Sequence, residues 1–170
     1  MRSVSALVPH PGGKMEPMTA TLTSTGSTAA VIVTHQRAEL LRASLEQVVH
    51  QTHPVQWVIV VDNGAENAVR ELVESMAGDH GVYVPSETNL GGAGGFALGF
   101  LTALSLGADA VWCADDDGRP ADNTVLAELY RVAEANRLHE VSPAVCNIND
   151  PDQLAFPLRQ GLVWRRRMDE

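Results

Sequence analysis

Three consecutive aspartates, Asp115, Asp116 and Asp117, are the residues of this 170-residue chain whose types and spacing best suit chemistry. They follow the apolar run 110–114, so the pattern predicts three carboxylates at the carboxyl end of a buried strand. Adjacent negative charges raise one another's pKa unless a cation or hydrogen bonds offset them. Mg²⁺ and Mn²⁺ take one or two carboxylates and complete their coordination with water and substrate phosphates. The triplet therefore predicts a divalent metal with a bound phosphate, although an Asp-rich turn that caps the next helix would also fit.

The elements that must position the triplet alternate between short apolar runs and segments with helical spacing. This alternation is typical of an α/β fold with a mostly parallel sheet and flanking helices, a Rossmann-like arrangement. Strands are predicted at residues 29–33, 57–61, 82–84, 110–114 and 141–145. Helices are predicted near residues 41–48, 67–76, 96–104 and 123–132, with Asn123 as the cap of the last and Gly107 ending the third.

The composition, 45% hydrophobic and 19% charged, is that of one globular domain with a single core. Residues 1–28 are rich in Ser, Thr, Pro and Gly, so they are predicted to form a disordered leader. Residues 29–150 are predicted to form the α/β domain. Residues 151–170 look irregular, with a hairpin near residues 162–164.

The charge and the cysteines exclude several classes of protein. A net charge of -9 argues against nucleic-acid binding, which needs a basic face. Cys113 and Cys146 are too far apart in sequence for a zinc motif or a disulfide framework, so they fit a reducing compartment. No apolar stretch approaches the roughly 20 residues of a membrane span, and no secretory signal is evident. We expect a cytoplasmic protein with at most peripheral contact with the membrane, at its inner face.

Polar motifs follow three of the predicted strands. Residues 34–37 follow the first strand, residues 62–64 the second, and the aspartate triplet the fourth. Because the carboxyl ends of parallel strands form the ligand crevice of an open sheet, we expect these motifs to share one site.

A glycine-rich segment, residues 89–95, precedes the third predicted helix. Its missing side chains would let the backbone approach a ligand, and the helix N-terminus offers N–H groups to an anion such as a nucleotide diphosphate. A dinucleotide-binding Rossmann protein is an alternative, because Gly92, Gly94, Ala97 and Asp115 match its loose spacing. That alternative does not explain three aspartates. The glycines could also serve close helix packing.

The motifs at residues 31–37, 60–64, 89–95 and 115–117 together resemble the nucleotide-sugar-binding half of inverting GT-A glycosyltransferases, in order and in spacing. With residues 154–159, they most resemble bacterial cell-wall galactofuranosyltransferases. The resemblance runs from about residue 29 to residue 167 and covers only the amino-terminal half of such enzymes.

The resemblance implies a role for each matching residue. Asp62 would read the uracil ring, and Asp116 would lie near the ribose or the donor sugar. Donor nucleotide-sugar binding is implied for Thr34, His35, Arg37, Asp62, Asn89, Gly91, Gly92 and Asp116, and metal binding for Asp115 and Asp117.

The implied activity is metal-dependent, inverting transfer of a sugar, galactofuranose, from a UDP donor to a polyprenyl-linked cell-wall glycan. Mn²⁺ or Mg²⁺ would neutralise charge on the departing UDP. The family places its catalytic base in the carboxyl-terminal half, and Asp150 and Asp152 beside Pro151 fit a turn better, so no base is assigned. Residues 151–170 would begin a truncated acceptor-side segment. A truncated or degenerate nucleotide-binding module without catalysis is the alternative.

Residues 164–167, a tryptophan followed by three arginines, form a basic cluster near the end of the chain. Clustered cations are attracted to anionic membranes, and the same charge would suit a lipid-linked pyrophosphate. A solvated basic strand end is the other interpretation.

Overall fold

The computed structural model describes residues 22–160 and 163–168. The chain divides into two compact units between His139 and Glu140, whereas the sequence suggested a boundary after residue 150. Most of the expected leader, residues 1–21, lies outside the described residues. Thr28, assigned to that leader, is buried and begins the first strand.

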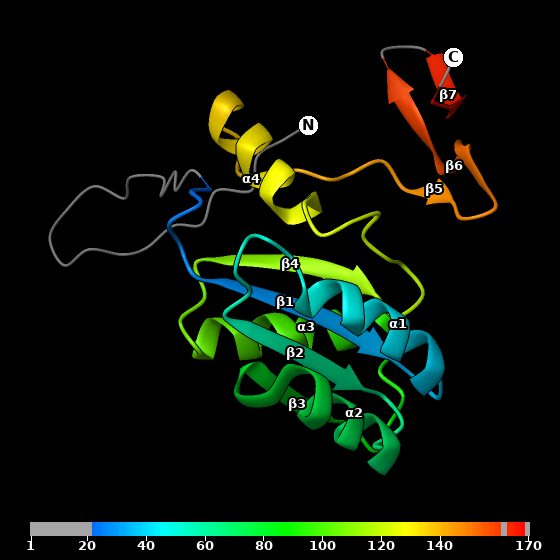
Figure 1. Ribbon diagram of the computed structural model, residues 1–170. Helices are drawn as coiled ribbons and strands as arrows, with labels where there is room; N and C mark the ends of the chain where they lie inside the picture. Colours follow the sequence, from blue (N-terminus) through cyan, green and yellow to red (C-terminus); the bar gives the residue numbers. More distant parts are fainter. Residues whose placement is uncertain (1–21, 161–162, 169–170) are drawn as a thin grey trace, which may run out of the picture. The chain divides into compact units, whose positions relative to one another are not determined.

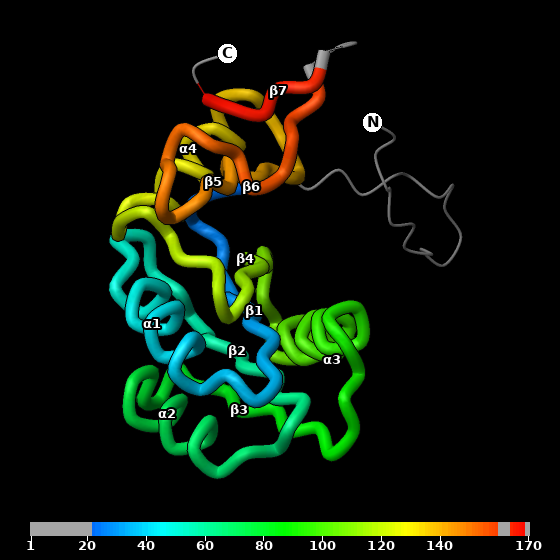
Figure 2. The backbone as a smooth tube through the Cα atoms, turned by 90° about the vertical axis from the view of Figure 1, so that its right-hand side faces the viewer, coloured from blue at the N-terminus to red at the C-terminus, as the bar shows by residue number. Residues whose placement is uncertain are grey.

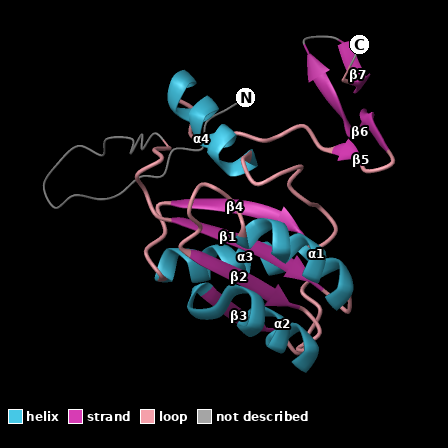
Figure 3. Cartoon of the chain, viewed as in Figure 1, coloured by secondary structure: helices cyan, strands magenta, loops and turns pink. Residues whose placement is uncertain are grey.

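The first unit contains a four-stranded parallel sheet in the order β3-β2-β1-β4 (Figures 1 and 3). Its strands are β1 (Thr28–Thr34), β2 (Trp57–Asp62), β3 (Gly81–Pro85) and β4 (Ala110–Asp115). Its helices are α1 (Ala38–Val49), α2 (Asn67–Ala77), the short 3-10 helix η1 (Gly78–His80), α3 (Gly91–Ser105) and α4 (Val125–Asn136). The first four strands and the helices between them therefore lie where the alternating pattern predicts. Within the described residues, no helix is both long and apolar enough to cross a bilayer.

Helices cover both faces of the sheet because its central strands are apolar on both sides. In β1, Ala30 and Ile32 belong to the core under α1 and α2, while Ala29 and Val31 belong to the core that includes Ala103 of α3. This alternation follows from the two-residue period of a strand. Figure 2 shows α1 and α2 on one side of the sheet and α3 on the other.

Strand β4 is an edge strand, so the prediction of a buried strand before the triplet is wrong. Within the described part of the chain, its hydrogen-bonded neighbour in the sheet is β1 alone. Val111, Cys113 and Asp115 share one exposed face, while Trp112 and Ala114 pack against the core under α1 and α2. An apolar run does not indicate whether a strand lies at the centre or the edge of a sheet, so the edge position of β4 could not be predicted from it.

Helix α3 begins within the glycine-rich segment, where a turn before the helix was predicted. Gly95 and Gly99 are buried, and a Cβ atom would lie 2.5 Å from Val33 Cγ1 at Gly95 and 2.3 Å from Val31 Cγ1 at Gly99. These two glycines therefore allow α3 to pack closely on β1. Gly107, with φ +82°, follows the helix, and its N–H donates to the Leu104 carbonyl, as predicted for a terminating glycine.

The predicted cap of the fourth helix is wrong by one residue. Thr124, not Asn123, directly precedes α4. Asp122 Oδ1 accepts hydrogen bonds from the Thr124 N–H at 2.7 Å and from Thr124 Oγ1 at 2.6 Å. An aspartate side chain bonded to the backbone two residues later forms a local turn, and here it leads the chain into the helix.

The second unit contains a three-stranded sheet in the order β5-β6-β7. Its strands are β5 (Cys146–Asn147), β6 (Asp150–Gln160) and β7 (Val163–Arg167), and β6 pairs antiparallel with both neighbours. The strand predicted at residues 141–145 is absent, since Pro143 has no N–H to donate. The tail is more regular than expected, and the predicted hairpin is confirmed as the antiparallel pair β6 and β7. The residues that join these two strands, 161 and 162, lie outside the described residues.

Candidate functional site

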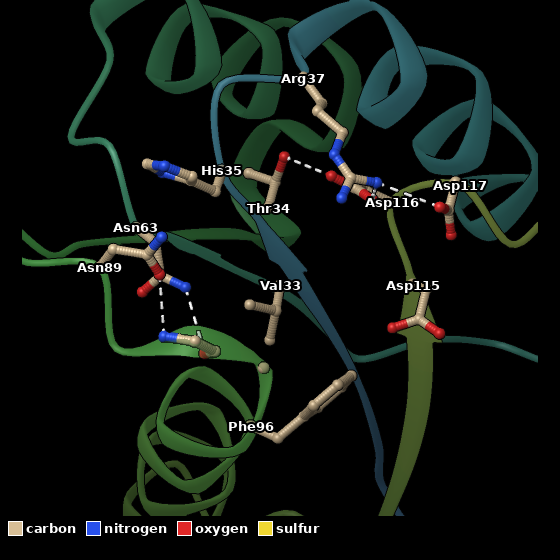
Figure 4. A pocket seen from close by; sticks show the side chains of 12 residues that line it. Val33, Thr34, His35, Arg37, Asn63, Asn89, Phe96, Asp115, Asp116 and Asp117 are labelled. Carbon is tan, nitrogen blue, oxygen red and sulfur yellow. Dashed lines mark hydrogen bonds and ion pairs between the residues drawn. The ribbon is translucent and has the colours of Figure 1, made fainter.

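A pocket of about 420 Å³ lies at the carboxyl ends of the strands in the first unit (Figure 4). Residues from β1, from the segments after β1, β2 and β3, from the first turns of α3, and from the end of β4 meet there. They are Val33, Thr34, His35, Arg37, Asn63, Asn89, Gly91, Gly92, Phe96, Asp115, Asp116 and Asp117. The expectation that the polar motifs share one site is met for all three loops.

Asp116 is the buried member of the triplet. Its Oδ2 accepts a hydrogen bond from Thr34 Oγ1 at 2.9 Å, and its Oδ1 accepts one from Arg37 Nη1 at 3.2 Å. The same arginine nitrogen donates to Asp117 Oδ2 at 3.1 Å. Thr34 at the end of β1 and Arg37 just after it therefore bind two of the three aspartates directly, as Figure 4 shows.

Asp115 differs from its neighbours, because its exposed carboxylate has no hydrogen bond or ion pair to any described residue. Partial desolvation raises the pKa of Asp115, and the charges of Asp117 and Asp116 raise it further, while Arg37 opposes them. Asp115 is thus a negative group on the pocket wall that lacks a close positive partner.

The backbone around the triplet is hydrogen-bonded to a side chain of α1. Ser44 Oγ donates to the carbonyl of Asp115 at 3.1 Å and to that of Gly118 at 3.0 Å, and the Gly118 N–H donates to the Asp115 carbonyl at 3.2 Å. Sequence analysis missed Ser44. The only signal in the sequence was its position, because Ser44 is a polar residue on the helix face that also carries the apolar residues at positions 41, 45 and 48.

Asp62 does not line the pocket. Its carboxylate is fully buried and accepts hydrogen bonds from the N–H groups of Gly64 at 2.9 Å and Glu66 at 2.6 Å, and from the Tyr83 hydroxyl at 2.9 Å. Burial, together with the hydrogen bond to Asp62 and its charge, raises the pKa of Tyr83 to about 12. Asp62 therefore shapes the turn after β2, and its neighbour Asn63 faces the pocket.

Asn63, which sequence analysis did not select, joins the turn after β2 to the start of α3. Its Nδ2 donates to the Gly91 carbonyl at 3.3 Å, and its Oδ1 accepts from the Leu90 N–H at 3.3 Å. Asn89 Oδ1 accepts from the Gly91 N–H at 2.8 Å. Gly91 and Gly92 have open space where a side chain would be, so backbone can approach a ligand there.

His35 and Phe96 complete the pocket wall. His35 Nδ1 is a buried nitrogen without a hydrogen-bond partner among the described residues. A buried polar atom without a partner is costly, so a ligand in the pocket that bonded to it would lower that cost. Phe96 and Val33 add an apolar surface to the pocket.

The pocket fits a divalent ion only together with a ligand. The described residues contain no group of three or more His, Cys, Asp or Glu side chains placed to hold a metal. Mg²⁺ and Mn²⁺, however, commonly bind one or two carboxylates plus substrate phosphates. Asp115 has no competing partner, and Asp117 is held only by an exposed ion pair. These two oxygen donors fit such an ion once a phosphate supplies further ligands.

Comparison with known proteins agrees with this geometry. The family model of glycosyl transferase family 2 matches residues 29–169. The chain is 56% identical over 149 residues to the galactofuranosyltransferase GlfT1 of Mycolicibacterium smegmatis, which covers 88% of this chain and 49% of that protein. The chain thus spans about half the length of the curated relatives it matches.

Solved structures share the fold at low sequence identity. A mannosyltransferase from Pyrobaculum calidifontis in complex with GDP-Man and Mn²⁺ aligns with a TM-score of 0.52 and 21% identity, covering 75% of this chain and 37% of that one. Residues 1–349 of S. aureus TarS in complex with UDP align with a TM-score of 0.54 and 16% identity, covering 73% of this chain and 43% of that one. The first unit has the Rossmann-like GT-A fold, and the chain belongs to glycosyl transferase family 2.

Proposed function

We propose that this chain carries the donor site of a metal-dependent, inverting galactofuranosyltransferase that uses a UDP-linked sugar. The observation that carries the proposal is the pocket in which Asp115, Asp116 and Asp117 face the glycine-rich start of α3. The choice of sugar is supported by the 56% identity to a galactofuranosyltransferase. The choice of UDP is supported by the UDP complex of a protein with the same fold.

Each predicted donor residue keeps a defined place in this proposal. Gly91 and Gly92 offer open space to a diphosphate at the N-terminus of α3, and Asn89 holds that turn by accepting the Gly91 N–H. His35 presents its unpartnered Nδ1 to the nucleotide. Asp62 acts through the turn that places Asn63, since its own carboxylate is fully used.

Asp115 and Asp117 are the residues proposed to hold Mn²⁺ or Mg²⁺. When bound, such an ion neutralises the charge that develops on the departing diphosphate. Thr34 and Arg37 orient the Asp116 carboxylate by donating hydrogen bonds to its two oxygens. The attacking hydroxyl and its base belong to the acceptor side, and no described residue is assigned as base.

The proposed acceptor is a polyprenyl-linked glycan at the inner face of the plasma membrane, which the protein would contact peripherally. The support lies in residues 153–168, which contain four arginines and no acidic residue in a chain of net charge -9. The side chain of Trp164 in this segment is 60% exposed. Such a segment fits an anionic lipid surface.

Titration calorimetry with UDP, UDP-galactofuranose and NAD, each with and without Mn²⁺, tests the proposal. We expect both UDP ligands to bind, with affinity that depends on Mn²⁺ and falls at least tenfold in Asp115→Asn. Metal-independent binding of NAD would support the dinucleotide alternative instead. Donor binding without sugar transfer to a lipid-linked glycan would support the alternative of a nucleotide-binding module.

A further inference from the structure

One nitrogen of Arg37 lies between two carboxylates of the triplet. Nη1 is 3.2 Å from Asp116 Oδ1 and 3.1 Å from Asp117 Oδ2. A positive group shared in this way offsets the repulsion between neighbouring carboxylates, as a small cation would. The guanidinium is therefore the counter-ion of Asp116 and Asp117.

The backbone places Arg37 in this position. Gln36, just before it, has φ +56°, a left-handed conformation that is uncommon for a residue other than glycine. Arg37 itself directly precedes α1, with φ -136° and ψ 45°. The chain thus turns sharply after β1, and the arginine side chain lies across the end of the sheet toward β4 (Figure 4).

The two contacts of Arg37 differ in how easily they exchange. The Asp116 side chain is only 7% exposed and also accepts a hydrogen bond from Thr34, so this contact is anchored. The Asp117 side chain is 59% exposed and the Arg37 side chain 50%, so their ion pair is open to solvent. Exposed ion pairs contribute little to stability and are readily exchanged.

We propose that Arg37 competes with the divalent ion for Asp117 and, once displaced, pairs with the diphosphate of the donor. This inference rests on the proposed metal site, because Asp115 is free of ion pairs whereas Asp117 must exchange its partner. Arg37 lines the same pocket as the glycine-rich start of α3, so its released charge stays beside the bound diphosphate. Metal and nucleotide would then bind cooperatively, since the nucleotide offsets the charge of the displaced arginine.

The proposal predicts an unusual sign for a substitution in a binding site. Removing the competing charge in Arg37→Gln should strengthen the binding of Mn²⁺ alone by about three- to tenfold, since attraction at an exposed pair is modest. The same substitution should weaken UDP binding in the presence of Mn²⁺, because a cation that faces the diphosphate is lost. A residue that merely supported the site would weaken both.

The test is a titration of the whole chain with Mn²⁺ alone, followed by calorimetry and by the electron paramagnetic resonance signal of free Mn²⁺. Arg119→Gln is the matched control, because it removes the same charge two residues after the triplet from a side chain outside the pocket. We expect Arg119→Gln to change Mn²⁺ affinity less than twofold. Arg37→Lys keeps the charge but loses the planar fork, so its Mn²⁺ affinity should lie between those of wild type and Arg37→Gln.

Unchanged or weaker Mn²⁺ binding in Arg37→Gln, when wild type does bind Mn²⁺, overturns the role of Arg37 and leaves the metal site in place. An equal gain in Arg119→Gln also overturns it, because the effect would then be general electrostatics. Absence of Mn²⁺ binding in wild type and in both Arg37 variants overturns the proposed metal site as well. If Arg37→Gln fails to fold by circular dichroism, the comparison of Arg37→Lys with wild type decides.

Discussion

Asp115, Asp116 and Asp117 are adjacent in sequence but meet three different environments. Asp116 is buried and bonded on both oxygens, Asp117 shares an exposed ion pair, and Asp115 has no bonded partner among the described side chains. Their chemistry therefore differs although their side chains are identical. The order of readiness to accept a new cation follows from these contacts, with Asp115 first and Asp116 last.

Asp115→Asn should make the folded chain more stable near pH 7. The pKa of Asp115 is raised in the folded state, so folding disfavours its ionised form, and that penalty is present above the folded pKa. As the pH falls through the folded pKa the penalty disappears, and it is absent below the unfolded value of 3.8. Thermal melting from about pH 7 to about pH 3.5 should show the gain of the variant shrinking on acidification.

Asp79→Asn is the matched control for this measurement, since Asp79 lies on η1, outside the pocket. It should lack the gain in melting temperature that Asp115→Asn shows near neutral pH. A gain for Asp115→Asn that persists unchanged at the lowest pH would contradict the assigned cause.

The individual roles in the triplet could not be predicted from the sequence, whereas its position could. The apolar run before Asp115 placed it at a strand end, and the motifs at Thr34 and Asn89 met it in one pocket. The sequence did not show that the turn after β2 would take up the carboxylate of Asp62, so Asp62 was expected in the pocket where Asn63 lies instead. A repeated aspartate says nothing about which copy finds a hydrogen-bond donor, because this depends on residues about 80 positions away.

At the scale of helices and strands, periodicity predicted the elements that form the core but not the pairing of strands at its edge. The strands at β1 and β2 were predicted within one residue because both their faces are apolar. The edge position of β4 and the loss of a strand at residues 141–145 were not predicted. Both depend on hydrogen bonds between strands, which an apolar run does not specify.

Gly99→Ala should destabilise the first unit by about 1–3 kcal/mol, because overpacking a close contact forces backbone or side-chain shifts. The added Cβ would lie 2.3 Å from Val31 Cγ1, on a strand that has no room to move. Gly92→Ala is the control in the same helix, since its Cβ meets nothing within 4 Å. Alanine favours helix over glycine by up to about 1 kcal/mol, so urea unfolding should show equal or higher stability for this control.

The hairpin of β6 and β7 should bind vesicles that contain anionic lipid and not vesicles of neutral phosphatidylcholine. Trp164 and Arg165 are exposed on β7, and each basic residue near an anionic surface contributes about 1 kcal/mol. Arg165→Gln should therefore weaken co-sedimentation about fivefold. Equal binding to neutral vesicles, or no loss in Trp164→Ala and Arg165→Gln, would contradict this role.

At the scale of the whole molecule, the pocket and the hairpin of β6 and β7 belong to different units. Every residue that lines the pocket lies before His139, and the arginine-rich strand lies after Glu140. The proposed binding of nucleotide and the proposed binding to a lipid surface would therefore depend on separate sets of contacts within this chain. The sequence suggested this division but placed it about ten residues later, because the strand predicted at residues 141–145 joined that segment to the sheet.

A chain shortened to end at His139 should keep its helical circular dichroism signal and its Mn²⁺-dependent binding of UDP, within about threefold. It should lose binding to anionic vesicles, because it lacks β6 and β7. Calorimetry and vesicle co-sedimentation on the same preparation measure both. Loss of UDP binding in a shortened chain that still folds would show that the second unit contributes to the donor site.

The close approach of α3 to β1 through Gly95 and Gly99 has a mechanical consequence for the pocket. Such tight contacts leave little freedom for sliding, so the glycine-rich wall moves together with the sheet as one stiff support. The opposite wall, formed by Arg37 and Asp117, is held by a solvent-exposed ion pair and can rearrange at low cost. Any adjustment of the pocket between its empty and ligand-bound shapes should therefore be concentrated on the arginine side.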